Sequence, residues 1–357
     1  MMKFIPAHFV AFLLLTIVEF SSQCVADNSV PLYGIHPDKG SLQSQHFLKT
    51  VIEPEIVADY INENHALDGI VFCSVLNVGI NDIYLVEAKA EKFALRLSRA
   101  EHDMAADEFC FELEWLEFLH QHGVPVSYPI RRSDNLLLGS IKSPEGPRYA
   151  TLFSYAEGTT DMNEEQAYIL GRALAKLHLV SDTFVTTLNR VTLDRQNLID
   201  GPIQTIKESF DASMDEEVNY LNFLSKELKD RLESIEKTEG VFGIVAGDVH
   251  GYNQHFTENN QLTMFDFEFC AYGYRIYDLA TFRWSRGSDN LELWHAFLDG
   301  YQSIRVLNKT EIESIDAFVK IRNLWWMGCI LKMPEYKEML GNDFWEYVFA
   351  RFVPKAL

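Results

Sequence analysis

Residues 246–253 read AGDVHGYN, and residues 264–268 read MFDFE. The first stretch contains Asp248 and, five residues later, Asn253, an interval that fits a tight loop. Asp266 lies in a short apolar run that predicts a strand ending beside this loop. We therefore expect two carboxylates and one side-chain amide to converge at one place in the fold.

Such a group of side chains suits transfer of a phosphoryl group from ATP, because this chemistry depends mainly on positioning and on neutralising phosphate charge with Mg²⁺. Asp248 would accept the proton of an attacking hydroxyl. Asn253 would offer a neutral oxygen to the metal, and Asp266 would supply the main Mg²⁺ carboxylate. The alternative is that all three are ordinary turn residues, since Asp and Asn are favoured in turns.

The two stretches resemble the catalytic and metal-binding loops of the superfamily of aminoglycoside phosphotransferases, homoserine kinases and choline kinases. In that family the first loop usually reads His-Gly-Asp, four residues and Asn, and the metal strand ends in Asp-Phe. Asp248, Asn253 and Asp266 match this pattern, whereas Ala246 replaces the first His. The replacement bears on loop rigidity or rate more than on the type of reaction.

A third segment supports the resemblance. Residues 277–280 read YDLA, where the family has a helix that begins with the same motif. The resemblance implies that Asp278 is structural and accepts hydrogen bonds from the catalytic loop. A carboxylate that interacts with the helix dipole is the simpler alternative.

The fold implied by the resemblance is α+β, bilobal and protein-kinase-like, over about residues 47–345. A chain of 357 residues with 47% hydrophobic content exceeds what one compact domain usually holds, which also predicts two lobes. We expect an N-lobe of antiparallel sheet plus helix at 47–153, which covers the nucleotide. A mainly α-helical C-lobe at 154–357 would bind metal and substrate.

Hydrophobic periodicity predicts the elements within these lobes. Helices are expected at 47–62, 103–122, 164–180, within 203–238 and within 291–339. Three antiparallel strands are expected at 70–76, 83–86 and 92–97, and two further strands at 136–138 and 149–153.

The resemblance also implies a nucleotide site. The turn at 77–82 would cover the nucleotide through Gly79 and Asn81, and Arg96 would hold phosphate, which a guanidinium can do bidentately. Glu112 would be the acidic partner of Arg96, with Glu108 as the alternative. Backbone groups from Phe153 to Tyr155 would pair with adenine. Taken singly, these residues also suit a hairpin turn, a solvated strand charge and a solvated acidic helix face.

The net charge of the chain limits the classes of binding partner that we expect. The formal net charge of −21 disfavours nucleic acid and an anionic membrane surface, because both would be repelled. A small-molecule hydroxyl substrate, which can be cationic, is compatible with that charge. After residue 26 no apolar run is long enough to span a bilayer.

The amino terminus predicts export. Residues 4–20 are almost wholly apolar, so we expect a signal peptide at 1–26 with cleavage after Ala26, and then a polar tail at 27–46. A mis-set start codon or a short membrane anchor is the alternative. The requirement for ATP and four cysteines without paired spacing favour the cytoplasm instead. The two indications conflict, and both localisations stay open.

The sequence thus predicts an ATP- and Mg²⁺-dependent O-phosphotransferase that acts on an aminoglycoside-, homoserine- or choline-like small molecule. A protein serine/threonine kinase of the same fold is one alternative, and a catalytically weak nucleotide- or ligand-binding module is another. Only eleven residues (267–277) separate Asp266 from Asp278, which is too short for a long phosphorylatable loop and favours a small substrate.

Overall fold

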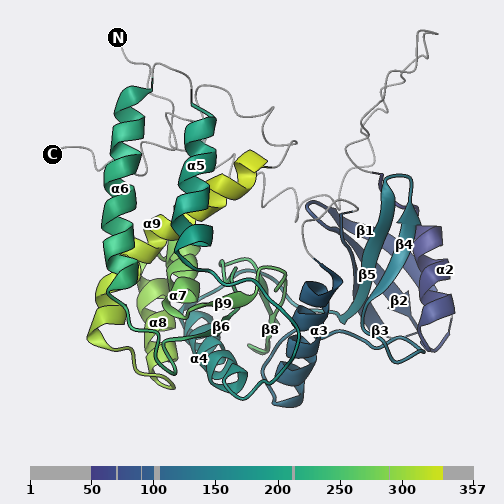
Figure 1. Ribbon diagram of the computed structural model, residues 1–357. Helices are drawn as coiled ribbons and strands as arrows, with labels where there is room; N and C mark the ends of the chain where they lie inside the picture. The colour runs from purple at the N-terminus through teal and green to yellow at the C-terminus, as the bar shows by residue number, and fades with distance from the viewer. Residues whose placement is uncertain are drawn as a thin grey trace, which may run out of the picture. The chain divides into compact units, whose positions relative to one another are not determined.

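The computed structural model describes residues 50–69, 71–89, 91–99, 105–210, 214–288 and 290–332. The predicted signal peptide at 1–26 and the polar tail at 27–46 lie outside these residues. The chain forms two compact units, which Figure 1 shows. The smaller unit extends to Asp103 and includes Ile130–Phe153, and the larger unit comprises Met104–Pro129 and the chain from Ser154 onward.

The smaller unit is built on a five-stranded sheet with the order β1-β2-β3-β5-β4. Its strands are β1 (Val71–Val78), β2 (Asp82–Ala88), β3 (Glu91–Leu97), β4 (Gly139–Ser143) and β5 (Gly146–Ser154). The antiparallel pairing of β1, β2 and β3 confirms the predicted three-stranded arrangement. Val57 and Ile61 of helix α2 (Pro54–Asn64) are fully buried and join the apolar side chains of this sheet in one core.

Two elements of the smaller unit begin at other residues than those predicted. Helix α2 starts at Pro54, because the fixed φ of proline suits the first helical position, so residues 50–53 of the predicted helix are not helical. The strand predicted at 136–138 is wrong. A turn occupies this region, in which Asn135 is left-handed (φ 68°) and the Arg132 N–H donates to the Leu136 carbonyl at 2.9 Å. The strand therefore begins only at Gly139.

Helix α3 (Ala106–Gln121) belongs to the larger unit, whereas the sequence assigned it to the lobe at 47–153. Its buried aromatic side chains explain this position. Phe111 makes edge contacts with Phe184 and Tyr272, and Trp115 makes one with Phe267. Phe184, Tyr272 and Phe267 all lie in the larger unit, so α3 is part of its core.

The rest of the larger unit is mainly helical, as predicted. Its helices are α4 (Glu164–Ser181), α5 (Gly201–Glu208), α6 (Asp215–Glu233), α7 (Ile276–Phe282), α8 (Leu291–Gln302) and α9 (Lys309–Lys332), with π-helical turns at Gln196–Asp200 and Arg283–Gly287. Asn163 caps α4 by accepting a hydrogen bond from the Gln166 N–H. Helices α4 and α8 pack closely because Gly171 has no side chain, and a Cβ there would lie 2.0 Å from the Phe297 carbonyl oxygen.

Two small antiparallel pairs of strands flank the loops that contain Asp248, Asn253 and Asp266. Strand β6 (Phe242–Val245) pairs with β9 (Ala271–Tyr274), and β7 (Gln254–Phe256) pairs with β8 (Leu262–Met264). The chain runs from β6 through residues 246–253 into β7, and from β8 through residues 265–270 into β9. The strand predicted to include Asp266 therefore ends earlier, at Met264. The sheet of the smaller unit and the helical larger unit confirm the α+β, protein-kinase-like fold class.

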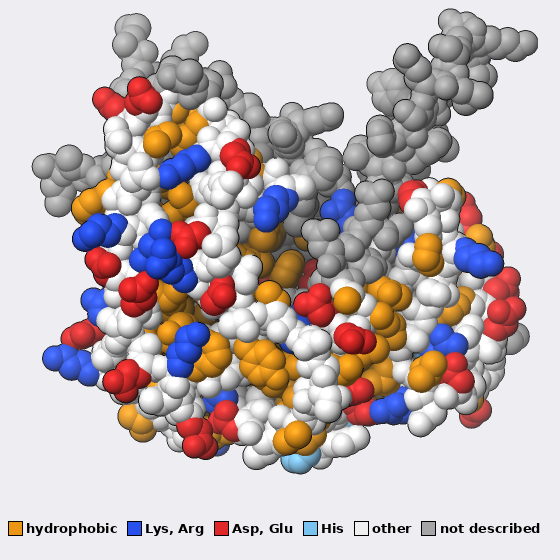
Figure 2. All heavy atoms as spheres, in the orientation of Figure 1, with side chains coloured by type: hydrophobic (Ala, Val, Ile, Leu, Met, Phe, Trp, Pro, Cys, Tyr) orange, Lys and Arg blue, Asp and Glu red, His pale blue; other side chains and the backbone are white. Residues whose placement is uncertain are grey.

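On the face seen in Figure 2, Lys and Arg side chains are interspersed with Asp and Glu side chains. Among the described residues, no helix combines the length and the apolar character that a membrane crossing requires.

Candidate active site

The loop between β6 and β7 passes close to the segment that follows β8. Gly247 is left-handed (φ 83°), and a Cβ at this position would lie 2.0 Å from the Phe269 carbonyl oxygen. At the far end of the loop, the Phe265 N–H donates to the Asn253 carbonyl at 3.0 Å. Gly247 is therefore required by the backbone approach, which places residues 248–253 against residues 265–269.

Asp278 of α7 fixes the start of this loop. Its Oδ2 accepts a hydrogen bond from the Ala246 N–H at 2.7 Å, and its Oδ1 accepts one from the Gly247 N–H at 2.8 Å. The side chain is fully buried. These bonds confirm the structural role that the resemblance implied for Asp278.

His178 of α4 supports Asp278 in turn. Its Nε2 lies 3.0 Å from Asp278 Oδ2, which can only accept, so Nε2 carries the proton. Nδ1 is then the acceptor for the Tyr301 hydroxyl at 2.8 Å. Burial lowers the pKa of His178 to about 4, against a stabilising hydrogen bond to Asp278. The imidazole is therefore neutral near pH 7.

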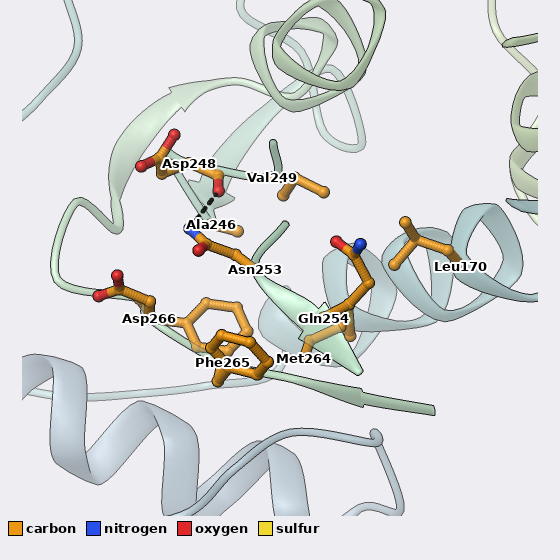
Figure 3. Close-up of a pocket in the computed structure, with 10 residues that line it drawn as sticks. Leu170, Ala246, Asp248, Val249, Asn253, Gln254, Met264, Phe265 and Asp266 are labelled. Carbon is orange, nitrogen blue, oxygen red and sulfur yellow. Dashed lines mark hydrogen bonds between the residues drawn. The ribbon is translucent and has the colours of Figure 1, made fainter. Parts of the chain in front are cut away.

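Asp248, Asn253 and Asp266 line one small pocket of the larger unit, which Figure 3 shows. The side chain of Asn253 is oriented by its own loop, because Nδ2 donates to the Asp248 carbonyl at 3.1 Å. Its Oδ1 is the atom that this bond leaves for a ligand. The pocket also has an apolar part, formed by Leu170, Ala246, Val249, Met264, Phe265 and Phe267.

Asp266 reaches the pocket through an unusual backbone conformation. Strand β8 ends at Met264, two residues earlier, and Asp266 is left-handed with φ 63°. Asp tolerates this conformation better than most residues. Figure 3 shows the carboxylates of Asp248 and Asp266 and the amide of Asn253 on the same side of the pocket.

The carboxylate of Asp248 is held by an arginine that the sequence did not single out. Nη2 of Arg322, on α9, donates to Asp248 Oδ1 at 2.5 Å. Nη1 of Arg322 donates to the Tyr277 hydroxyl at 3.2 Å and lies 3.4 Å from the Gly247 carbonyl oxygen. Burial acts to lower the pKa of Arg322, but the Asp248 carboxylate and Tyr277 raise it above its ordinary value. Arg322 is therefore a permanent cation beside Asp248.

Aromatic rings surround this guanidinium. Its central carbon lies 4.7 Å from the centroid of Trp325, 5.3 Å from that of Trp284 and 5.7 Å from that of Trp326. In the structure these tryptophans pack around a charge that is 1% exposed, an arrangement in which cation–π attraction is strongest.

His250 is the second basic side chain near Asp248. Its Nε2 lies 3.8 Å from Asp248 Oδ2, which is too long for a hydrogen bond. Burial lowers the pKa of His250, although Asp248 acts in the opposite direction. Among the described residues no donor forms a hydrogen bond to Oδ2 of Asp248, and Asp248 lines the pocket.

The donors at the pocket suit Mg²⁺. Within the described ranges, no three His, Cys, Asp or Glu side chains cluster in a way that could hold a metal by themselves. Mg²⁺ is usually bound by one or two carboxylates together with phosphate oxygens and water, so it does not need such a cluster. Asp266 and Asn253 supply the hard oxygen atoms that such binding requires.

The nucleotide residues predicted in the smaller unit lie near one another. Gly79 and Asn81 form the turn between β1 and β2, where the Gly79 N–H donates to the Asn81 carbonyl at 3.1 Å. Arg96 of β3 pairs with Ile83 of β2, two residues beyond Asn81. Its guanidinium lies 5.0 Å from the ring centroid of Phe153 on β5.

The other two predicted nucleotide residues, Glu112 and Tyr155, belong to the larger unit. Glu112 is fully buried on α3, which excludes the alternative of a solvated acidic face for this residue. Glu108 accepts a hydrogen bond from the Ala105 N–H at 3.2 Å and so caps the start of α3. Tyr155 follows β5 directly.

Comparison with known proteins agrees with this geometry. The sequence model of the phosphotransferase enzyme family matches residues 75–307. A protein of uncharacterized function from Synechocystis is 35% identical over 298 residues, which cover 78% of this chain and 82% of that protein. A homoserine kinase of Rhizobium etli is 26% identical over 238 residues, 64% of this chain and 70% of the kinase.

A solved structure has the same fold. It is the amicoumacin kinase hAmiN in complex with AMP-PNP, Ca²⁺ and Ami, and it superposes with a TM-score of 0.69 at 17% identity. The match covers 84% of this chain and 92% of that kinase.

Proposed function

The chain belongs to the phosphotransferase enzyme family, and on that premise we propose that it is an ATP- and Mg²⁺-dependent kinase for the hydroxyl group of a small molecule. The observation that carries the proposal is the convergence of Asp248, Asn253 and Asp266 on one pocket, where no described donor is bonded to Oδ2 of Asp248 or to Oδ1 of Asn253.

Each side chain has a defined task in this proposal. Asp248 orients the acceptor hydroxyl and takes its proton at Oδ2, while the hydroxyl oxygen bonds to the γ-phosphorus and the bond from that phosphorus to ADP breaks. Asp266 and Asn253 hold Mg²⁺, which neutralises phosphate charge when bound. Arg96 engages phosphate with Glu112 as its acidic partner, the turn at Gly79 and Asn81 covers the nucleotide, and the backbone from Phe153 to Tyr155 pairs with adenine.

The acceptor is proposed to be aminoglycoside-, homoserine- or choline-like. The homoserine kinase relative and the amicoumacin kinase structure supply two of the candidates for testing. A cationic acceptor is compatible with the net charge of −21, but Arg322 already neutralises the Asp248 carboxylate. An ammonium group of the acceptor would therefore have to pair with a carboxylate other than Asp248.

A protein serine/threonine kinase is the second candidate. The segment between Asp266 and Asp278 disfavours it, because residues 271–274 form strand β9, paired with β6, and α7 begins at Ile276. This leaves little chain for a regulated activation segment. The third candidate, a catalytically weak binding module, draws on Ala246 in place of the family His.

The test incubates the purified full chain with Mg²⁺ and γ-labelled ATP, first with homoserine, choline and an aminoglycoside, and then with a cell extract. Asp248→Asn is run beside it. We expect label in a small molecule only with the intact enzyme. Label in protein would support the second candidate, and no Asp248-dependent label, with nucleotide still bound, would support the binding module.

A further inference from the structure

Arg322 lies outside the three side chains that carry the proposed function, yet it makes the only described hydrogen bond to the Asp248 carboxylate. We propose that Arg322 is a positioning residue, which fixes the rotation of that carboxylate so that Oδ2 faces the acceptor hydroxyl. This inference rests on the proposed function. It assigns a catalytic consequence to a residue on α9, 74 positions along the chain from Asp248.

The geometry separates the two oxygens of Asp248. Oδ1 accepts a hydrogen bond from Nη2 of Arg322 at 2.5 Å, whereas Oδ2 accepts none from the described residues and lies 3.8 Å from Nε2 of His250. A carboxylate without a bond to either oxygen can rotate about its terminal torsion, which has a broad energy profile. One strong, charge-assisted bond to Oδ1 removes that freedom and leaves Oδ2 as the proton acceptor.

The guanidinium itself is held from several directions. Tyr277 and the Gly247 carbonyl lie at Nη1, and the rings of Trp284, Trp325 and Trp326 enclose the planar group. Trp325 and Trp326 are three and four positions after Arg322 on α9, so all three share one face of the helix. The cation is therefore held by contacts other than that with the carboxylate.

A structural role alone explains this arrangement less well. Nε of Arg322 is buried and has no hydrogen-bond partner among the described residues, and a buried donor left in this state is destabilising. Phosphoryl transfer tolerates a neutralised carboxylate, because orientation of the nucleophile matters more than the strength of the base when bond formation lags behind bond breaking. The contact at the Gly247 carbonyl also supports the loop beside Ala246, which has no polar side chain.

The experiment compares Arg322→Met, Arg322→Lys and the control Arg283→Met by kcat, the KM for ATP and Tm. Arg283 also contacts a tryptophan, Trp294, but its carboxylate partner is the exposed Asp316. Turnover is measured as Mg²⁺-dependent ATP hydrolysis, with water as acceptor, and with the acceptor found above. We expect kcat of Arg322→Met to fall about 100-fold, as for other displaced catalytic groups, with the KM for ATP nearly unchanged.

Arg322→Lys keeps the charge and should recover part of kcat, and free guanidinium at low, non-denaturing concentration should restore part of the activity of Arg322→Met. Arg283→Met should leave kcat unchanged. Unaltered kcat per folded molecule of Arg322→Met would overturn the proposal in favour of a purely structural pair. An increase in kcat would also overturn the proposal, because it would mean that the bond to Arg322 lowers the activity of Asp248.

The pair is also tested without turnover, which separates this inference from the proposed function. The losses in Tm of Arg322→Met and Asp248→Asn should not add in the double variant, because both abolish the same charge-assisted interaction. Additive losses would overturn the inference even in an active enzyme. If the intact chain transfers no phosphoryl group to any acceptor, including water, the proposed function fails and the positioning role is overturned with it, whatever the Tm values show.

Discussion

The two units each bury an arginine against an aspartate, and the two pairs differ in what else the guanidinium touches. In the smaller unit Arg148 donates to Asp82 at 2.7 Å and also to the carbonyl oxygens of Ser98, Thr50 and Leu97. In the larger unit Arg322 donates to Asp248 and Tyr277, makes one long contact with a backbone carbonyl, that of Gly247 at 3.4 Å, and is otherwise surrounded by tryptophan rings.

The difference shows that burial of a charge pair does not by itself mark a functional site. Arg148 joins β5 to two backbone segments, one at Leu97–Ser98 and one at Thr50, so its hydrogen bonds hold the sheet together. Arg322 makes its shortest bond to a side chain that lines a pocket. A guanidinium satisfied by backbone carbonyls stabilises the fold, whereas one directed at a single pocket carboxylate sets the orientation of that carboxylate.

The largest expected effect comes from a substitution in the Arg322–Asp248 pair of the larger unit. Asp248→Asn removes the proton acceptor but keeps the shape, so turnover should fall by about a thousandfold or more, within the range of general-base contributions. Nucleotide binding, measured by calorimetry, should remain. The matched variant Asp82→Asn should instead act mainly by lowering Tm. Retained turnover in Asp248→Asn would remove Asp248 from the mechanism.

The next largest effect is expected when the Arg148–Asp82 pair of the smaller unit is broken. Arg148→Met leaves Asp82 as a buried carboxylate without its cation, which costs about 3–5 kcal/mol of the free energy of unfolding. Urea denaturation monitored by fluorescence measures this loss. The exposed pair of Lys226 and Asp230 serves as the control, because breaking a surface pair of this kind changes stability by less than about 1 kcal/mol. Equal effects of Arg148→Met and Lys226→Met would contradict the structural role.

The asymmetry between the pairs also explains what the sequence could predict. The loop at 246–253, Asp266 and the YDLA motif are local patterns, and the pocket forms where their spacing indicated. The antiparallel strands and most helices follow from periodicity. Arg322 could not be found this way, because its partner lies 74 residues earlier and no local spacing links them. Only the Trp pair one turn later on α9 hints at a special position.

The two strands that were predicted wrongly were mispredicted for the same physical reason. The strand predicted at 136–138 relied on three consecutive leucines, but Leu136 is 57% exposed and follows a turn closed by backbone hydrogen bonds. The strand predicted to include Asp266 ends earlier, because that residue adopts a left-handed conformation. Tertiary hydrogen bonds and backbone conformation decided both cases, and neither is visible in hydrophobicity alone.

A smaller effect sharpens the comparison within the pocket itself. Asp248 has a cation as partner, whereas Asp266 is proposed to hold Mg²⁺, so Asp266→Ala should weaken Mg²⁺-dependent nucleotide binding by at least about tenfold. Titration of AMP-PNP with and without Mg²⁺ measures this change. Binding without Mg²⁺ should be nearly unaffected. If the variant lost affinity equally in both conditions, Asp266 would be a structural residue and not a metal ligand.

The smallest effect concerns a third buried carboxylate, Asp278, whose basic partner His178 is neutral. Burial lowers the pKa of His178 from 6.5 to about 4, so between these values the unfolded chain binds a proton that the folded chain does not. Stability should therefore fall as the pH decreases from about 6.5 to 4, by at most about 1.4 kcal/mol per pH unit from this residue. His178→Gln keeps a donor for Asp278 and an acceptor for Tyr301 but does not titrate. The free energy of unfolding, measured in urea at several pH values, should fall less steeply in the variant. Parallel pH profiles would show that His178 is not neutral in the folded state. Asp278 would then have a charged basic partner, as Asp82 and Asp248 have.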